Sequence, residues 1–177
     1  MTSSDQTALP NDAKARAAER VRSVVDGADA RVARVAFVCA EFNGGITSRL
    51  LVGALDVLDE RGVATTDRAL VWVPGAFEAP LAAARLAGSG AWDAIICLGA
   101  VIRGDTGHYD FVAGQCAAGL ERVQLDTGVP VVFGVLTTDT VDQALDRSMP
   151  DATNKGREAA LTALAMVSVL SGAGALR

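Results

Sequence analysis

His108 is the only histidine in this chain of 177 residues, and it stands in the glycine-flanked stretch GDTGHYD at residues 104–110, beside the only tyrosine, Tyr109. An imidazole both accepts and donates protons near neutral pH, so a histidine exposed in a turn could act as a general acid and base. A surface histidine with no role is the alternative. The surrounding elements decide between the two, because a catalytic histidine must lie where a ligand can bind.

Four short runs rich in β-branched residues predict buried strands, and helical patterns lie between and after them. The strands are expected at residues 34–39, 69–73, 94–102 and 130–136. The first helical stretch carries Leu51, Leu55 and Leu58 on one stripe, and the others are expected at 77–90, 110–128, 139–148 and 154–170. Gly62, Gly88 and Gly128 follow the last apolar residues of three of these helices, where helices commonly end. Strands buried on both faces and separated by helices predict an α/β domain with a four-stranded parallel sheet between two helical layers.

Ligands bind at the carboxyl ends of the strands in such sheets, so the loops after the strands are the candidate functional region. These loops read AEFNGGITS, PGAFE, RGDTGH and LTTDT in chain order. His108 therefore lies on the expected functional edge of the sheet, which favours a catalytic or ligand-binding role over an idle surface residue.

Other side chains in these loops suit a flat, polar and anionic ligand. Phe42 and Phe77 could stack on the two faces of a heterocycle, although packing in the core is the alternative for each. Glu78 could accept hydrogen bonds from a ligand, or could simply lie at a helix start. Asp105 and Thr106 could hold an anion at the start of the following helix, or could serve as its N-cap.

Composition narrows the class of protein. Half of the residues are hydrophobic and the mean hydropathy is +0.30, so we expect apolar surface to be buried between subunits. A net charge of −5 and the lack of any run of Lys or Arg argue against nucleic acid as a partner. No apolar stretch reaches the ~18–20 residues of a membrane span.

Cysteine spacing and the N-terminal region add two expectations. Cys39, Cys97 and Cys116 show no metal-binding spacing, so they are predicted to be reduced core thiols of a cytoplasmic protein, and no metal site is expected. Residues 1–30 are polar and predict a flexible arm with a frayed helix at 13–25, followed by a single domain at 31–177.

Six strings occur together in the order and spacing typical of one enzyme family. They are EFN, PGAFE, GAVIRGDTGHYDFV, FGVLTTDT, QALDR and NKG, and over residues 31–172 the chain resembles the lumazine synthases of riboflavin biosynthesis. The resemblance implies a flavodoxin-like fold and a transferase without a cofactor. The implied reaction condenses 5-amino-6-(D-ribitylamino)uracil with 3,4-dihydroxy-2-butanone 4-phosphate to 6,7-dimethyl-8-ribityllumazine, releasing phosphate and water.

The same resemblance assigns roles to residues at matching positions. His108 is similar to the family's proton-transfer residue, and Arg147 to its phosphate-binding arginine. The implied substrate-binding residues are Phe42, Ala76, Phe77, Glu78, Ala100, Val101, Ile102, Asp105, Thr106 and Phe133, the last supplied by a neighbouring subunit. Lys155 and Glu158 fall near the same site, and Gly107 stands where the family commonly has proline or threonine.

The resemblance also implies pentamers, and the short segment RSMPDATNKG favours packing of pentamers into a 60-subunit shell, with riboflavin synthase as a candidate partner. Two other functions fit the same pattern of strands. A flavin-binding module could use NGGITS as a phosphate cradle, and a riboflavin synthase of related fold would act on lumazine itself. A purely structural shell protein is a third reading, which the polar and aromatic loops argue against.

Overall fold

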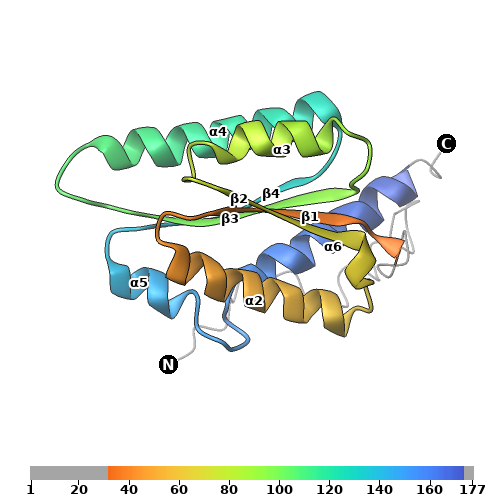
Figure 1. Cartoon of the computed structure of the whole chain (residues 1–177), viewed down its shortest axis with the longest axis horizontal. Coiled ribbons are helices and arrows are strands. Elements are labelled where there is room, and N and C mark those ends of the chain that lie inside the picture. The colour runs from red at the N-terminus through yellow and green to blue at the C-terminus, as the bar shows by residue number, and fades with distance from the viewer. Residues whose placement is uncertain (1–31, 174–177) are drawn as a thin grey trace, which may run out of the picture.

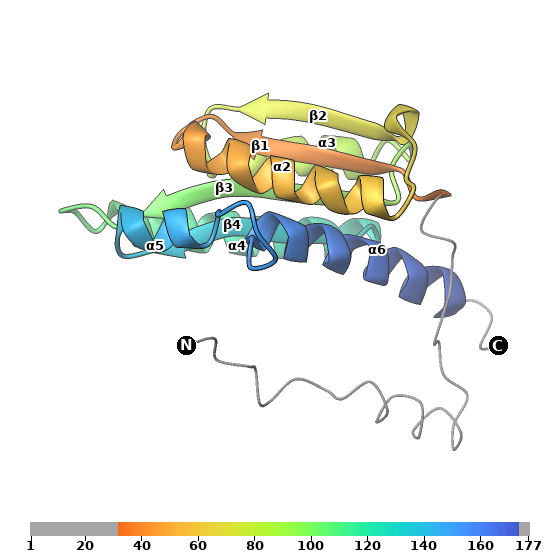
Figure 2. The same ribbon diagram turned by 90° about the horizontal axis from the view of Figure 1, so that it is seen from below.

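The computed structural model of the protein describes residues 32–173, so the arm predicted at 1–30 and its helix at 13–25 lie outside the described residues. A four-stranded sheet in the order β2-β1-β3-β4 forms the centre of the fold, and every pair of neighbouring strands is parallel. The strands are β1 (Val35–Ala40), β2 (Arg68–Val73), β3 (Ala94–Ile102) and β4 (Val131–Thr138). Figure 2 shows the strands running in the same direction, so their carboxyl ends share one edge of the molecule.

Helices cover both faces of the sheet, as the three-layer α/β/α prediction requires (Figure 1). The helices are α2 (Gly44–Glu60), α3 (Ala79–Ala87), α4 (His108–Thr127), α5 (Val141–Asp146) and α6 (Lys155–Ala173), with a short 3₁₀ turn η2 (Thr65–Asp67) before β2. The α2 and α6 helices pack together with α5 on one face, and α3 packs against α4 on the other. Within the described residues, no helix combines the length and the apolarity that crossing a membrane would need.

Burial on both faces of the sheet explains why the sequences of the inner strands β1 and β3 are apolar without interruption. Along β1, Val35 and Phe37 face the core beneath α2 and α6, whereas Ala36 and Val38 face the core beneath α3 and α4. Side chains of a strand alternate between the two faces of a sheet, so a strand covered on both sides buries every residue. The predicted burial of β1 and β3 is confirmed.

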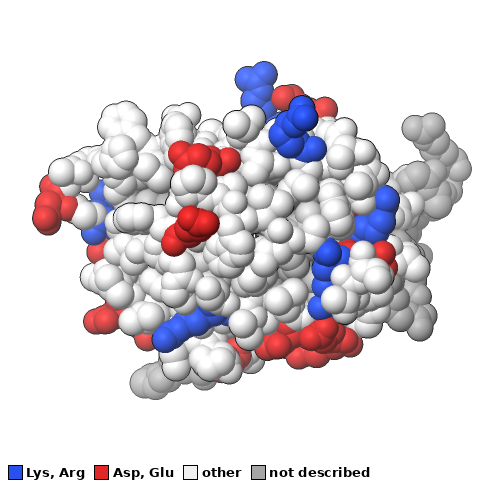
Figure 3. Space-filling model, viewed as in Figure 1, with Lys and Arg blue, Asp and Glu red and all other residues white. Residues whose placement is uncertain are grey.

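The prediction of full burial is wrong for the two outer strands of this chain. In β2, Leu70, Val71 and Trp72 are 46%, 37% and 40% exposed, and Phe133 in β4 is 41% exposed. The physical reason is position, because β2 and β4 form the two edges of the sheet and are only partly covered by helices. The face that includes β2 carries few charged side chains in its centre (Figure 3).

Glycine ends the predicted helices, but not by one mechanism. Gly128 has a φ of 71° directly after α4, and Gly62 has a φ of 73° shortly after α2, the left-handed conformation that suits glycine. Gly88 ends α3 with a right-handed φ of −70°, and the left-handed residue there is Gly90.

Candidate active site at the carboxyl ends of the strands

A cavity of about 490 Å³ lies where β1, β2 and β3 end, which is the edge at which the sequence predicts ligand binding. Most of the predicted site residues line it: Phe42, Ala76, Phe77, Glu78, Ala100, Val101, Ile102, Thr106 and His108. Residues from three separate stretches of the sequence thus meet around one space large enough for a small molecule.

Main-chain hydrogen bonds set the position of the two aromatic rings. Beyond the end of β1, the Glu41 N–H donates to the carbonyl of Val73 at 2.8 Å and the Phe42 N–H to that of Pro74 at 3.1 Å. This pairing holds the Phe42 loop beside the PGAFE loop that carries Phe77. Phe42 is 72% exposed and Phe77 is 56% exposed, so neither ring fills the core, and both are free to contact a ligand.

Asn43 shapes the same loop, and the sequence analysis missed it. Its φ of 59° places it in the left-handed region, where asparagine is among the few tolerated residues besides glycine. Its Nδ2 donates to the carbonyl of Ala100 at 2.9 Å, which ties the loop after β1 to the end of β3. Asparagine before two glycines in FNGG was the signal that could have revealed this turn.

His108 is the first residue of α4 and lines the cavity. The N-cap is Gly107, with no side-chain hydrogen bond, so the alternative that Asp105 or Thr106 caps this helix is wrong. Both residues are exposed, and Thr106 lines the cavity whereas Asp105 is not among its lining residues. Glu78 occupies the N-cap position of α3 without capping it, which leaves its carboxylate available to a ligand.

Phe133 and Arg147 lie in a different place. They line a second cavity, of about 660 Å³, formed by β4, the end of α5 and the first turns of α6. Lys155 and Glu158 line it too and form an ion pair with each other. Arg147 follows the last residue of α5, and its Nη1 donates to the carbonyl of Gln143 at 3.0 Å. Apart from Asp105, which lines neither cavity, the predicted site residues therefore form two groups in two cavities of one chain.

The three cysteines are free and buried in the core, as predicted. Burial raises the pKa of the Cys39 thiol to about 12 and that of Cys116 to about 11, and it raises the pKa of Cys97 well above the ordinary value. Nucleophilic attack and metal binding both need the thiolate, which these surroundings disfavour. The cysteines therefore take no part in the site chemistry.

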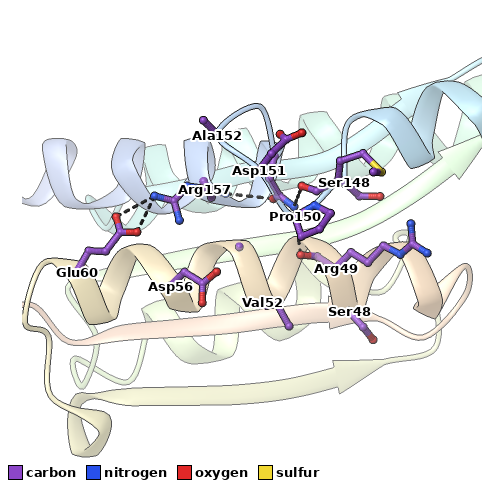
Figure 4. A pocket seen from close by; sticks show the side chains of 13 residues that line it. Ser48, Arg49, Val52, Asp56, Glu60, Ser148, Pro150, Asp151, Ala152 and Arg157 are labelled. Atoms are coloured by element: carbon purple, nitrogen blue, oxygen red, sulfur yellow. Dashed lines mark hydrogen bonds and ion pairs between the residues drawn. The ribbon is translucent and has the colours of Figure 1, made fainter.

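A third cavity, of about 720 Å³, lies between α2 and the loop that joins α5 to α6 (Figure 4). None of the predicted site residues lines it. Across it, the Nη2 of Arg157 donates to both carboxylate oxygens of Glu60, at 2.9 and 2.8 Å. This ion pair joins α6 to α2, which indicates that Arg157 and Glu60 have a structural role.

Comparisons with known proteins identify the family of the chain. Residues 32–171 match the family model described as 6,7-dimethyl-8-ribityllumazine synthase. The chain is 54% identical over 137 residues to a protein of that name from Protochlamydia amoebophila (strain UWE25), covering 77% of this chain and 80% of the relative. It is 55% identical over 139 residues to one from Edwardsiella ictaluri (strain 93-146), covering 78% and 89%. The chain belongs to the 6,7-dimethyl-8-ribityllumazine synthase family.

Proposed function

We propose that this protein carries out the lumazine synthase condensation of riboflavin biosynthesis at a site that two neighbouring subunits complete together. The reaction joins 5-amino-6-(D-ribitylamino)uracil to 3,4-dihydroxy-2-butanone 4-phosphate, forms 6,7-dimethyl-8-ribityllumazine, and releases phosphate and water. The observation that carries the proposal is the division of the site residues between two separate cavities, each lacking part of what the reaction needs.

The cavity at the strand ends suits the pyrimidine and the proton transfers. Phe42 and Phe77 offer aromatic faces to the ring, and the Glu78 carboxylate accepts hydrogen bonds from polar groups of the ribityl chain. Condensing an amine with a ketone and closing a second ring require protons to be taken and returned several times. His108 performs these transfers at the mouth of this cavity.

The second cavity suits the phosphate. Arg147 carries a permanent charge and a planar fork of donors, which binds phosphate oxygens in pairs. Phe133 provides an apolar wall. The backbone N–H groups at Asp105 and Thr106 of the neighbouring subunit, together with the Thr106 hydroxyl, donate to the same phosphate. Much of the rate acceleration then comes from holding two substrates in line, an effect worth ~7–11 kcal/mol in well-oriented model reactions.

The assembly that provides such shared sites is a pentamer, and twelve pentamers form a 60-subunit shell. Apolar side chains exposed on both edge strands support contacts between subunits, because exposed patches of this kind favour association. The connection between α5 and α6 is short and carries no insertion that would obstruct contacts between pentamers. We assign the enzyme to the cytoplasm, where its free thiols stay reduced, and riboflavin synthase is the candidate partner for the shell.

Complementation between two impaired variants, assayed with the phosphate substrate well below its KM for Arg147→Ala, tests the shared site. His108→Ala and Arg147→Ala are each assayed with both substrates by the fluorescence of the lumazine formed, and are then unfolded and reassembled as an equal mixture. Random assortment around a ring restores about a quarter of the sites in the mixture, because an Arg147→Ala subunit supplies His108 and its His108→Ala neighbour supplies Arg147. A mixture no more active than the two variants alone refutes the shared site, and an inactive unaltered protein refutes the condensation itself.

A further inference from the structure

Arg103 occupies the junction between β3 and the turn that leads to His108, and its side chain makes more contacts than any role stated above explains. Its Nη2 and Nη1 donate to the two carboxylate oxygens of Asp110 at 3.2 and 3.5 Å, and its Nε donates to Asp139 at 3.0 Å. The guanidinium also stacks over the ring of Tyr109, with 4.1 Å between the guanidinium carbon and the ring centroid. One side chain thus contacts both residues that follow His108 in the first turn of α4.

Tyr109 and Val112 pack the start of α4 against the core beneath α3 and α4, but the turn that leads into the helix has few polar contacts among the described residues besides those of Arg103. Gly104 and Gly107 flank the turn, and a Cβ added to either would meet nothing within 4 Å. Gly107 provides no side-chain cap, and the backbone bond from the Asp110 N–H to the carbonyl of Gly107 is long, at 3.3 Å. The Arg103 contacts therefore supply the polar side-chain ties that orient this first turn.

The other end of the Arg103 bridge is a well-ordered loop. Asp139 precedes α5, its N–H donates to the Gln143 side chain at 2.9 Å, and the Gln143 N–H donates to the Thr140 hydroxyl at 3.2 Å. The backbone N–H of Arg103 itself donates to the carbonyl of Thr138 at 2.9 Å. These bonds fix the loop in place, so a side chain anchored to it has a firm reference point.

The charges of the network keep the bridge intact. Hydrogen bonds to Asp110, and then to Asp139, raise the pKa of Arg103 above its usual value, so the guanidinium stays charged. Arg103 is 43% exposed and its two carboxylate partners are 67% and 69% exposed, so each ion pair alone contributes little to folding stability. The network of Arg103 therefore serves to orient the first turn of α4 and adds little to the stability of the fold.

We propose that Arg103 is a positioning residue for the condensation: by clamping Asp110 and Tyr109 to the loop at Asp139, it holds His108 at the angle and depth that proton transfer requires. The inference rests on the proposed function, since it concerns the catalytic position of His108. The Arg103 bridge also joins the two parts of one chain that serve different sites, because α4 begins with His108 and α5 ends beside Arg147.

The test compares Arg103→Ala and Arg103→Lys with Arg122→Ala. Arg122 lies on α4, the helix that begins with His108, and forms an exposed pair with Asp126 at 3.2 Å. Its removal therefore controls for the loss of an arginine–aspartate pair on that helix. We expect Arg103→Ala to lower kcat about 10–100-fold with little change in either KM, because small misplacements of a catalytic group carry costs of this size. Arg103→Lys keeps the charge without the planar fork and recovers part of the loss, whereas Arg122→Ala matches the unaltered enzyme.

Two further measurements separate positioning from other roles. In a His108→Ala background, Arg103→Ala should change kcat less than about twofold, because residues that act through one another are not additive. Hydrogen exchange of the amides at residues 111–114, the first in α4 with carbonyl partners inside the helix, should speed up in Arg103→Ala and not in Arg122→Ala. Additive losses in kcat, unchanged exchange at 111–114, or a rise in the KM for the phosphate substrate larger than the fall in kcat would each overturn the proposal. The exchange experiment needs no activity, so it decides about Arg103 even if the condensation fails.

Discussion

Replacing Asn154 by alanine should destabilise the fold far more than the loss of an ordinary helix cap. Asn154 is 1% exposed and precedes α6, where its Oδ1 accepts the N–H groups of Gly156 at 2.8 Å and Arg157 at 3.4 Å. Its Nδ2 donates to the carbonyls of Met149 at 2.9 Å and Arg49 at 3.3 Å, the latter within α2. One buried amide therefore caps α6, closes the preceding loop and ties both to α2.

The cost can be worked out from these bonds. Loss of an N-cap costs about 1 kcal/mol, and each of the two Nδ2 bonds contributes a net ~0.5–1.5 kcal/mol. The sum is about 3 kcal/mol, which corresponds to a fall of roughly 6–12 °C in Tm for a domain of this size. The two helices cannot close over the space left by the side chain, because their backbones already touch beside it: a Cβ added at Gly156 in α6 would overlap the carbonyl of Leu50 in α2.

The assay is thermal and urea-induced unfolding at a fixed protein concentration, since association changes the apparent stability. Thr140→Ala is the matched control, because Thr140 caps α5 by accepting the Gln143 N–H at 3.2 Å on an exposed surface and makes no comparable tie to another helix. We expect about 1 kcal/mol for the control and about three times as much for Asn154→Ala. Equal losses for the two variants would mean that Asn154 acts only as a cap, and would refute the reasoning.

Three further predictions follow from the site and the surface. His108→Ala should fold and assemble normally while kcat falls ~10²–10⁴-fold, and full activity across the pH range would contradict its role in proton transfer. Arg147→Ala should raise the KM of the phosphate substrate much more than that of the pyrimidine, by the equivalent of ~1.5–3 kcal/mol for a charge-assisted bond, and equal rises for both would remove it from the phosphate site. Hydrogen bonds from Arg34 hold the pKa of Asp93 below its ordinary value, so the stability that this carboxylate contributes is present at pH above the ordinary pKa and is lost as the pH falls through the lowered pKa. Asp93→Asn should flatten this acid limb of a stability titration by a small amount, because the pair is partly exposed to solvent.

The inner part of the fold could be predicted because its sequence pattern has one physical cause. Runs of apolar residues at β1 and β3 occur where helices cover both faces of the sheet, and both strands lie within two residues of their predicted bounds. The same pattern at β2 predicts burial that one chain does not provide, since Trp72 stays 40% exposed. An apolar run shows that a strand is to be covered, but it carries no information on whether the cover is a helix of the same chain or another molecule.

The site could be predicted in part for a similar reason. Loops after parallel strands must meet at one edge, so the spacing alone placed Phe42, Phe77 and His108 together. The ion pair of Arg103 with Asp139 was missed because its partner lies 36 residues away in the sequence, which local patterns cannot register. The left-handed turn at Asn43 had a local signal in FNGG, but its hydrogen bond to Ala100, 57 residues away, had none.

The family resemblance placed in one site residues that lie in two separate cavities of a single chain, and this separation limits which surfaces can meet in the proposed assembly. The cavity with His108 opens at the ends of β1, β2 and β3, whereas the cavity with Arg147 opens along β4, an edge strand of the sheet. A contact that completes the site must bring the strand-end surface of one subunit against the β4 side of the next, so it joins two different surfaces. Contacts of that kind are heterologous, and they close into a ring when the rotation between subunits fits. Each subunit in such a ring gives its His108 to one site and its Arg147 to the adjacent one, so every subunit takes part in two sites.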